Sequence, residues 1–143
     1  MRVYPREGSP TQQVIEVNNI GANSCGLSYF PLVFLGNSSS ANHGKDVHPL
    51  IPSGLGGAPA YPVKPRTAAL AVIDLNPSGA NAASGALTWI NELNVIASDH
   101  LPNAETQNFP LGEGVEVLNP KLGLYDSTID RAVKSMTEAD AKS

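Results

Sequence analysis

Charged residues and cysteine are both scarce in this sequence. Charged side chains make up 15 % of the 143 residues, against about 25 % in ordinary soluble domains. Cys25 is the single cysteine, so no disulfide can form within the chain, and a lone cysteine is typical of a reducing compartment or of a small buried hydrophobe. Asn, Ser, Gly, Ala and Pro take the place of charge. This composition favours strands joined by many turns and a surface largely covered by other protein.

Long apolar segments are absent as well. No stretch approaches the roughly 20 apolar residues that a membrane helix needs. The first ten residues, MRVYPREGSP, contain no apolar run of the kind found in a signal peptide. We therefore expect a protein that is made in the cytosol and has no membrane partner.

Basic residues are missing from a long part of the chain. The net charge of −4 argues against general nucleic-acid binding, which needs a basic stripe to displace counterions. Residues 67–120 contain six acidic residues and no Lys or Arg. We interpret these carboxylates as solvated side chains; an acidic surface that docks on a basic partner is the alternative. They are Asp74, Glu92, Asp99, Glu105, Glu113 and Glu116.

Recognisable catalytic and ligand-binding motifs are also lacking. His43 and His48 lie close together in NHGKDVH, but no further ligand follows at a spacing that suits a metal. The neighbours Ser-Asp-His at residues 98–100 cannot converge as a catalytic triad, and no catalytic signature surrounds Cys25. The glycines of SGLGGAP lack the spacing of a phosphate loop. Side-chain oxygens of the kind that bind calcium occur at Asp99, Asn103, Glu105, Glu113 and Glu116. Their spacing does not match that of an EF-hand. We predict no catalytic residue, no cofactor and no metal site, and hence no enzyme.

Alternation of apolar and polar residues predicts several strands. Residues 11–20 alternate, and residues 66–76 are an apolar run that ends at Asn-Pro. Residues 27–37 predict a third strand. Because proline cannot donate to a ladder, Pro31 makes it an edge strand or a bulged one. Residues 114–126 predict one or two short strands interrupted by Asn-Pro.

Residues 87–98 alternate almost perfectly, which predicts a strand with one buried and one wet side. Asn94 falls on the wet side. Together with residues 66–76 this strand suggests a hairpin with a long connection. The buried side would hold Leu87, Trp89, Leu93 and Val95.

The tail predicts an amphipathic helix over residues 127–140, with Asp126 or Ser127 as its N-cap. Apolar residues recur there at i, i+3, i+4 and i+7. They are Ile129, Ala132, Val133 and Met136.

Together these elements predict a mainly β fold. The expected architecture is a small antiparallel β-sandwich or open barrel with long loops, an extended N-terminal arm and a short C-terminal helix. One domain spans residues 1–143, with the arm at 1–10, the β-rich body at 11–126 and the helix at 127–140.

Residues 36–66 contain five glycines, five prolines and only four charged residues. A long loop without secondary structure is uncommon in a compact domain and is usually functional or disordered. Proline lowers the entropy that is lost when an extended segment is fixed. We therefore expect a Pro/Gly-rich connector that takes its order from a partner surface. Apolar residues of the arm and of this connector are predicted to bind the partner: Val3, Tyr4, Pro5, Leu50, Ile51, Leu55 and Tyr61.

The arm MRVYPREGSP, small-residue segments such as NPSGANAASGALTW and the size of the chain resemble the decoration (cement) proteins of tailed-phage capsids, or related small virion structural proteins. This resemblance implies a β-rich protein, often a trimer, that binds the outside of the shell and stabilises it against internal DNA pressure. It implies the major capsid protein or another virion protein as partner, a homo-oligomer, a place in the virion after synthesis in the host cytoplasm, and no direct contact with nucleic acid. It carries over no functional residue.

Other functions remain open. One is another phage structural component, such as a tail, connector or minor capsid protein. Another is a small enzyme or a β-sandwich that binds a ligand such as a carbohydrate. A binding module should gather exposed aromatic residues on one loop face, whereas aromatics make up only 6 % of this sequence and lie mostly within apolar runs. A pocket of polar residues around Cys25 or His100 would contradict the structural-protein interpretation.

Overall fold

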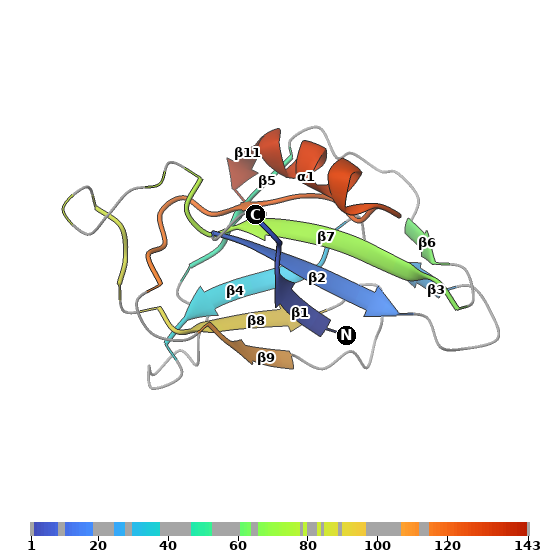
Figure 1. Ribbon diagram of the computed structural model, residues 1–143, viewed down its shortest axis with the longest axis horizontal. Helices are drawn as coiled ribbons and strands as arrows, with labels where there is room; N and C mark the ends of the chain where they lie inside the picture. The colour runs from blue at the N-terminus through green and yellow to red at the C-terminus, as the bar shows by residue number, and fades with distance from the viewer. Residues whose placement is uncertain are drawn as a thin grey trace.

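A computed structural model shows two packed sheets, a separate antiparallel pair of short strands and one helix (Figure 1). The residues that it describes are 2–8, 11–18, 25–27, 30–37, 47–52, 61–63, 66–77, 79, 83, 85–88, 90–96, 107–111 and 115–142.

The described residues form eleven strands and one helix. In chain order they are β1 (Arg2–Pro5), β2 (Gln12–Asn18), β3 (Cys25–Leu27), β4 (Leu32–Gly36), β5 (Leu50–Pro52), β6 (Tyr61–Val63), β7 (Ala68–Asp74), β8 (Glu92–Ile96), β9 (Gln107–Pro110), β10 (Lys121–Leu122), α1 (Ile129–Thr137) and β11 (Ala139–Lys142).

The larger sheet has six strands in the order β1-β2-β7-β10-β5-β11. Its longest pairing is antiparallel and joins β2 to β7, from Gln12 opposite Asp74 to Asn18 opposite Ala68. The short pairing of β10 with β5 is parallel. Side chains alternate between the two faces of a strand, and the neighbours Val14 and Ile15 on β2 are both fully buried. The centre of the larger sheet is therefore covered on both faces.

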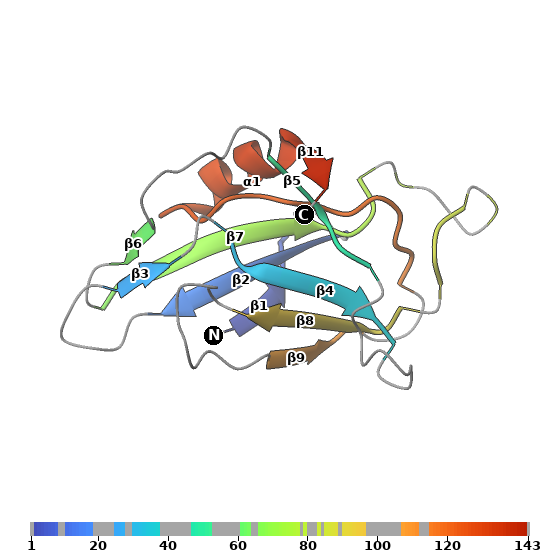
Figure 2. The ribbon, with the colours of Figure 1, turned by 180° about the vertical axis from the view of Figure 1, so that it is seen from behind.

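One face of the larger sheet packs on a three-stranded antiparallel sheet in the order β4-β8-β9. This smaller sheet lies behind the larger one in Figure 1 and in front of it in Figure 2. β3 and β6 pair separately with each other. The two facing sheets make a β-sandwich with an aliphatic core. Its buried residues are Ile15, Val33, Leu35, Ala69, Ala71, Ile73, Leu75, Ile90, Leu93, Val95, Val117, Leu122 and Tyr125.

α1 covers part of the opposite face of the larger sheet, next to β7 (Figure 1). Thr128 is its N-cap, and the Thr128 hydroxyl accepts a hydrogen bond from the Arg131 N–H at 3.3 Å. The predicted cap at Asp126 or Ser127 is wrong, because the Asp126 carboxylate instead accepts from the Ser127 N–H at 2.6 Å. The predicted apolar face of the helix is confirmed, since Ala132 and Met136 are buried against the sheet.

Gly123, just after β10, allows α1 to approach the sheet closely. A Cβ at this position would lie 2.5 Å from the Ala132 carbonyl oxygen and 2.8 Å from the Met136 nitrogen. The Gly123 N–H donates to the Val72 carbonyl at 3.0 Å. The adjacent Leu124 N–H donates to the Ser135 hydroxyl at 2.9 Å. The backbone after β10 thus lies close against α1 at Gly123 and is hydrogen-bonded to it through the Ser135 hydroxyl.

The predicted mainly β sandwich with a C-terminal helix is confirmed. The strands expected at residues 11–20 and 66–76 are β2 and β7. The edge position inferred from Pro31 is also confirmed, because β4 begins directly after this proline and lies at one edge of the smaller sheet.

The predicted hairpin between residues 66–76 and 87–98 is wrong. β7 belongs to the larger sheet and β8 to the smaller one. The long connection lets the second strand cross to the facing layer, where its apolar side chains meet the same core. The expected wet side of this strand is wrong as well at Asn94, which is only 1 % exposed.

Three boundaries differ from the prediction because distant parts of the chain pair with them. Residues 2–5 of the expected arm are extended, but they form β1 and pair with β2. The expected connector at residues 36–66 contains β5, an internal strand between β10 and β11, and β6, which pairs with β3. The helix ends at Thr137 instead of residue 140, because the chain from Ala139 onward joins the sheet as β11.

Candidate partner-binding surface

β1 lies at one edge of the larger sheet and presents an arginine and a tyrosine on its outer face. The Arg2 guanidinium forms an ion pair with the Glu16 carboxylate of β2 at 2.7 Å. It also lies 5.3 Å from the centre of the Tyr4 ring. The Arg2 side chain remains 67 % exposed. Arginine and tyrosine are enriched among the residues that dominate binding at protein interfaces, and here one is held against the other.

Hydrogen bonds keep the Glu16 carboxylate charged. The Asn18 side-chain amide donates to it at 3.0 Å and the Arg2 Nε donates at 2.8 Å, and these bonds lower the pKa of Glu16 below its ordinary value. Partial burial and the nearby Glu16 charge raise the pKa of Tyr4. At neutral pH this group therefore consists of one cation, one anion and one neutral phenol.

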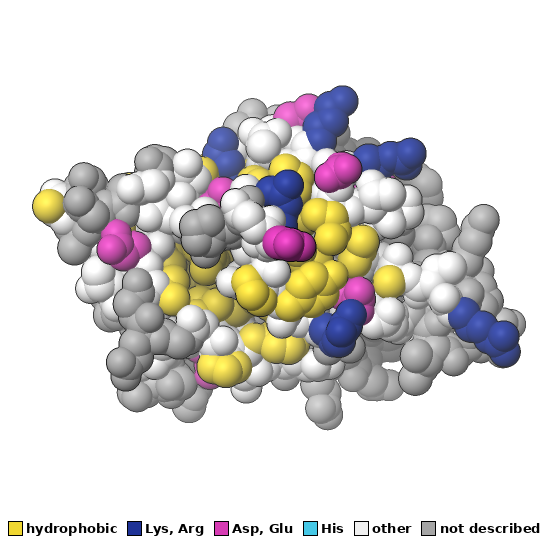
Figure 3. Space-filling view, in the orientation of Figure 1, with side chains coloured by type: hydrophobic (Ala, Val, Ile, Leu, Met, Phe, Trp, Pro, Cys, Tyr) yellow, Lys and Arg dark blue, Asp and Glu magenta, His cyan; other side chains and the backbone are white. Residues whose placement is uncertain are grey.

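Beside α1 the outer face of the larger sheet is partly apolar. Figure 3 shows hydrophobic side chains gathered in the middle of this face, with charged side chains around them. Four of them pack on the small core beneath the helix and remain partly exposed: Tyr4, Leu70, Ile129 and Val133. We call these four residues the outer apolar patch. It exists because the nine-residue helix covers β7 but not the whole sheet.

A chain of side-chain hydrogen bonds fixes the hairpin of β1 and β2 against β7. The Arg6 guanidinium donates to the Gln12 Oε1 at 2.8 Å, and the Gln12 amide donates to the Asp74 Oδ2 at 3.1 Å. The other Asp74 oxygen accepts from the Asn76 N–H at 3.0 Å. Asp74 is 7 % exposed, so these contacts are largely shielded from water. These bonds and the pairing with β2 hold β1 within the larger sheet of its own domain.

A hollow of about 450 Å³ is lined by residues of the edge strands β1 and β9. Its walls are Arg2, Val3, Tyr4 and Phe109. Val3 and Phe109 both pack on the core of the sandwich. This hollow therefore lies on the open side of the sandwich and joins the Arg2–Tyr4 pair to the core.

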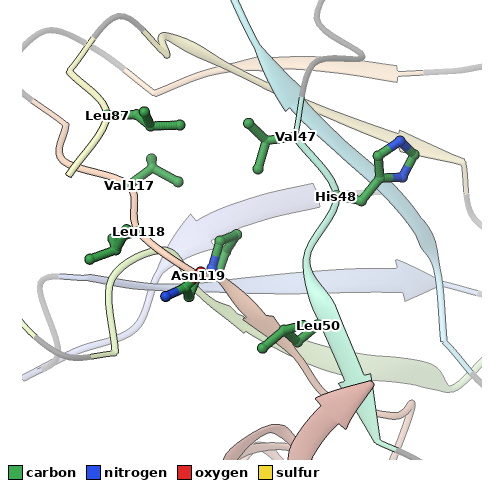
Figure 4. A pocket seen from close by; sticks show the side chains of 8 residues that line it. Val47, His48, Leu50, Leu87, Val117, Leu118 and Asn119 are labelled. Atoms are coloured by element: carbon green, nitrogen blue, oxygen red, sulfur yellow. The ribbon is translucent and has the colours of Figure 1, made fainter. Parts of the chain in front are cut away.

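A second hollow, of about 390 Å³, has mostly apolar walls. Figure 4 shows Val47, Leu87 and Val117 directed toward one another, whereas the His48 ring points away from them. The His48 ring instead meets the Phe34 ring edge-on at 4.9 Å between centres, beside a smaller hollow of about 200 Å³. The hollow of about 390 Å³ suits an apolar ligand. Its full lining is Val47, His48, Leu50, Leu87, Val117, Leu118, Asn119 and Pro120.

The predicted partner-binding residues do not form one surface. Val3, Tyr4 and Pro5 lie together on β1, at one edge of the larger sheet. Leu50 and Ile51 lie on β5, which is separated from β1 by three strands. Tyr61 is on β6 of the separate two-stranded sheet, opposite Leu27 of β3, and Leu55 lies outside the described residues.

Sequence reasoning missed three members of the outer apolar patch. Leu70 lies within the strand predicted at residues 66–76, and Ile129 and Val133 belong to the predicted apolar face of the helix. The helical spacing does identify that face, but it cannot show that only Ala132 and Met136 become buried.

Most residues considered for chemistry lie outside the described parts of the chain. These are His43, Asp99, His100, Asn103, Glu105 and Glu113, together with Ser98 and the side chain of Cys25. Among the residues that are described, no three His, Cys, Asp or Glu side chains gather closely enough to hold a metal ion. In the same residues, no helix has both the length and the hydropathy needed to cross a membrane.

Comparison with known proteins yields no relative. No protein-family model, no curated protein and no solved structure matches this chain.

Proposed function

We propose that this chain is a structural virion protein that binds the outside of a capsid shell and stabilises it through protein–protein contacts. Its partner is the major capsid protein or another protein of the virion, and the chain acts there as a homo-oligomer, for which a trimer is the form that the resemblance to decoration proteins implies. Such a protein works by mass action, because binding only the mature shell lowers the free energy of that state.

The observation that supports this proposal best is the outer apolar patch next to the exposed Arg2. Arginine and tyrosine next to aliphatic side chains are typical of interface hot spots. The low charge of the whole sequence fits a surface that becomes covered by other protein. The patch lies on regular strands and a helix, so a partner would meet a preformed surface and little ordering entropy would be lost.

The first test is the place of the chain in virus particles purified from the source of the sequence. Mass spectrometry should find the chain in the particle fraction in amounts comparable to a shell component. Immunogold electron microscopy of intact particles should label the shell surface. A chain confined to the soluble fraction would overturn the proposal. Label restricted to the tail or its attachment site would instead support a tail, connector or minor capsid component.

Patch variants can then test the surface itself. Tyr4→Ala with Val133→Ser should weaken binding to shells about 30-fold or more, because hot-spot truncations cost about 2 kcal/mol. Lys134→Ala is the matched control, since this exposed residue lies on α1 outside the patch. Thermal melts of all three proteins would show that the fold is retained. Equal binding of the patch variant and the control would exclude the outer apolar patch as the surface that binds the shell.

A small ligand-binding module is the second candidate, and the hollow lined by Val47, Leu87 and Val117 favours it. Its volume lies at the lower end of the range for small-molecule sites. Saturable fluorescence of 1-anilinonaphthalene-8-sulfonate that is lost in Leu87→Trp, which fills the hollow, would favour this function. Fluorescence that does not saturate would count against it.

A further inference from the structure

Pro5 occupies an outward-facing backbone position of the edge strand β1. The Arg6 N–H donates to the Gln12 carbonyl at 3.0 Å, and these two residues continue the register that sets Pro5 opposite Gln13. Hydrogen-bonded and non-hydrogen-bonded pairs alternate along an antiparallel ladder. The backbone groups of Pro5 therefore face away from β2. Because proline has no N–H, the outer edge of β1 lacks a donor there.

β9, an edge of the smaller sheet, has the same arrangement. The Leu111 N–H donates to the Asn91 carbonyl at 2.9 Å. This bond continues the register that sets Pro110 opposite Glu92. By the same alternation, the backbone groups of Asn108 and Pro110 face away from β8. The outer edge of β9 therefore also lacks a donor at a proline.

The other edges of these two sheets are interrupted in different ways. On β4, Leu35 exchanges two backbone hydrogen bonds of 2.8 Å with Val47, which covers the edge at that point. Pro31 lies directly before β4 and supplies no backbone donor there. On β11, the pairing register shifts between Ala139 and Ala141. Such an irregularity bends a strand and disturbs its edge.

We propose that these four edges are built to prevent strand addition by a second copy of this chain. A regular edge strand offers a row of free N–H and C=O groups to any other strand. A proline within a strand is tolerated only where its missing donor faces outward. Pro5 and Pro110 occupy such positions on edges of different sheets. The inference rests on backbone geometry and does not depend on binding to a capsid.

The test restores the missing donors at the two exposed prolines. Pro5→Val with Pro110→Val adds an N–H and a β-branched side chain to each edge and removes no core packing, because both prolines are exposed. Light scattering coupled to size-exclusion chromatography would measure the mass over a range of protein concentrations. The double variant should at least double its mean mass at concentrations where the wild type keeps a constant mass. Infrared spectra of that fraction should show added intermolecular β-structure.

Two control variants separate edge protection from general damage to the fold. Pro77→Val replaces an exposed proline in the turn after β7, away from every sheet edge, and should keep the wild-type mass. Pro5→Lys with Pro110→Lys restores the same donors but places charge on the edges, which also discourages pairing, and should stay close to the wild type. An unchanged mass of the valine variant would overturn the proposal. Equal aggregation of the lysine variant would overturn it as well, because the prolines would then be needed for the fold.

Discussion

Replacing Gly123 by alanine should push α1 off the larger sheet. The added Cβ would lie 2.5 Å from the Ala132 carbonyl oxygen, 2.7 Å from the Ser135 hydroxyl and 2.8 Å from the Met136 nitrogen. Non-bonded carbon atoms prefer separations of about 3.5 Å or more. Two of these three atoms belong to the helix backbone, so a change of rotamer cannot relieve the clash. The whole helix would have to move outward, which would loosen the packing of its buried side chains.

The expected cost follows from two opposing effects. Adding a methyl group to a well-packed site costs about 1 to 3 kcal/mol, and the rigid backbone neighbours favour the upper end. The smaller conformational entropy of the unfolded alanine variant offsets about 0.4 to 1 kcal/mol of this. Gly123 has no positive φ, so no further backbone strain arises. We expect the free energy of unfolding to fall by about 2 kcal/mol, which lowers the urea midpoint by about 1 M if m is about 2 kcal/mol/M.

Urea titration followed by far-UV circular dichroism would measure this loss. Gly79→Ala is the comparison variant, because Gly79 has φ +68° and no atom near its Cβ position; its cost of about 1 to 2 kcal/mol reports backbone strain alone. The pair Gly123→Ala and Ser135→Ala should recover none of the loss, because the clashes with Ala132 and Met136 remain and the Leu124 N–H loses its acceptor. A Gly123→Ala protein as stable as the wild type would refute the close contact between strand and helix.

Three further changes test other parts of the structure. Asp74→Ala should lower the free energy of unfolding by about 2 kcal/mol, since it removes the acceptor of the Asn76 N–H and of a glutamine side chain; a loss below about 0.5 kcal/mol in urea would contradict this. Burial raises the pKa of Tyr125 above its ordinary value of 10.0, so the folded state binds this proton more tightly and stability is lost as the pH rises above 10. Tyr125→Phe should flatten that decline in unfolding curves measured from pH 8 to 11, and an unchanged slope would exclude Tyr125 as its source. Asn18→Ala removes a hydrogen bond that lowers the pKa of Glu16, so NMR titration should find that pKa higher than in the wild type. The stability that Glu16 contributes is present above its ordinary pKa and is lost as the pH falls below it, and Asn18→Ala should reduce this acid-sensitive part.

The strands and the helix whose burial shows in the spacing of their own apolar residues were predicted correctly from the sequence. The alternation in β2, the apolar run of β7 and the helical spacing of Ala132 and Met136 each reflect burial of one face of one element. Pro31 predicted an edge strand because a missing donor is a property of the residue itself. These elements make up the centre of the sandwich and the helix that covers it.

Pairing between distant segments could not be read from the sequence in the same way. β5 lies within a Pro/Gly-rich stretch and is a strand only because β10 and β11, far along the chain, hold it on both sides. β8 resembles the second arm of a hairpin, but the length of its connection leaves its sheet undetermined. Gly123 gives no signal either, because its role depends on a helix backbone that approaches from another part of the chain.

The candidate surface, too, was predicted only in the part that depends on single residues and not in the part that depends on how distant segments pack. The sequence predicts Tyr4 as a partner-binding residue of an extended arm, whereas the structure holds this partly exposed residue in a sheet beside Arg2. The apolar patch next to it depends on how far a nine-residue helix reaches across the sheet. Neither the composition nor the periodicity of the sequence shows how much of the sheet the helix covers.

The position of β5 in the larger sheet has a consequence for synthesis on the ribosome. β1, β2 and β7 can pair before residue 121 has been made, but both neighbours of β5 come from residues 121 onward. Roughly 70 residues separate β5 from β10, and at about 5 to 20 residues per second their translation takes about 4 to 14 s. During that interval the apolar residues of β5 have no strand to pair with and are open to chaperones. Silent codon changes that slow translation between residues 53 and 120 should therefore lower the soluble yield without altering the finished protein.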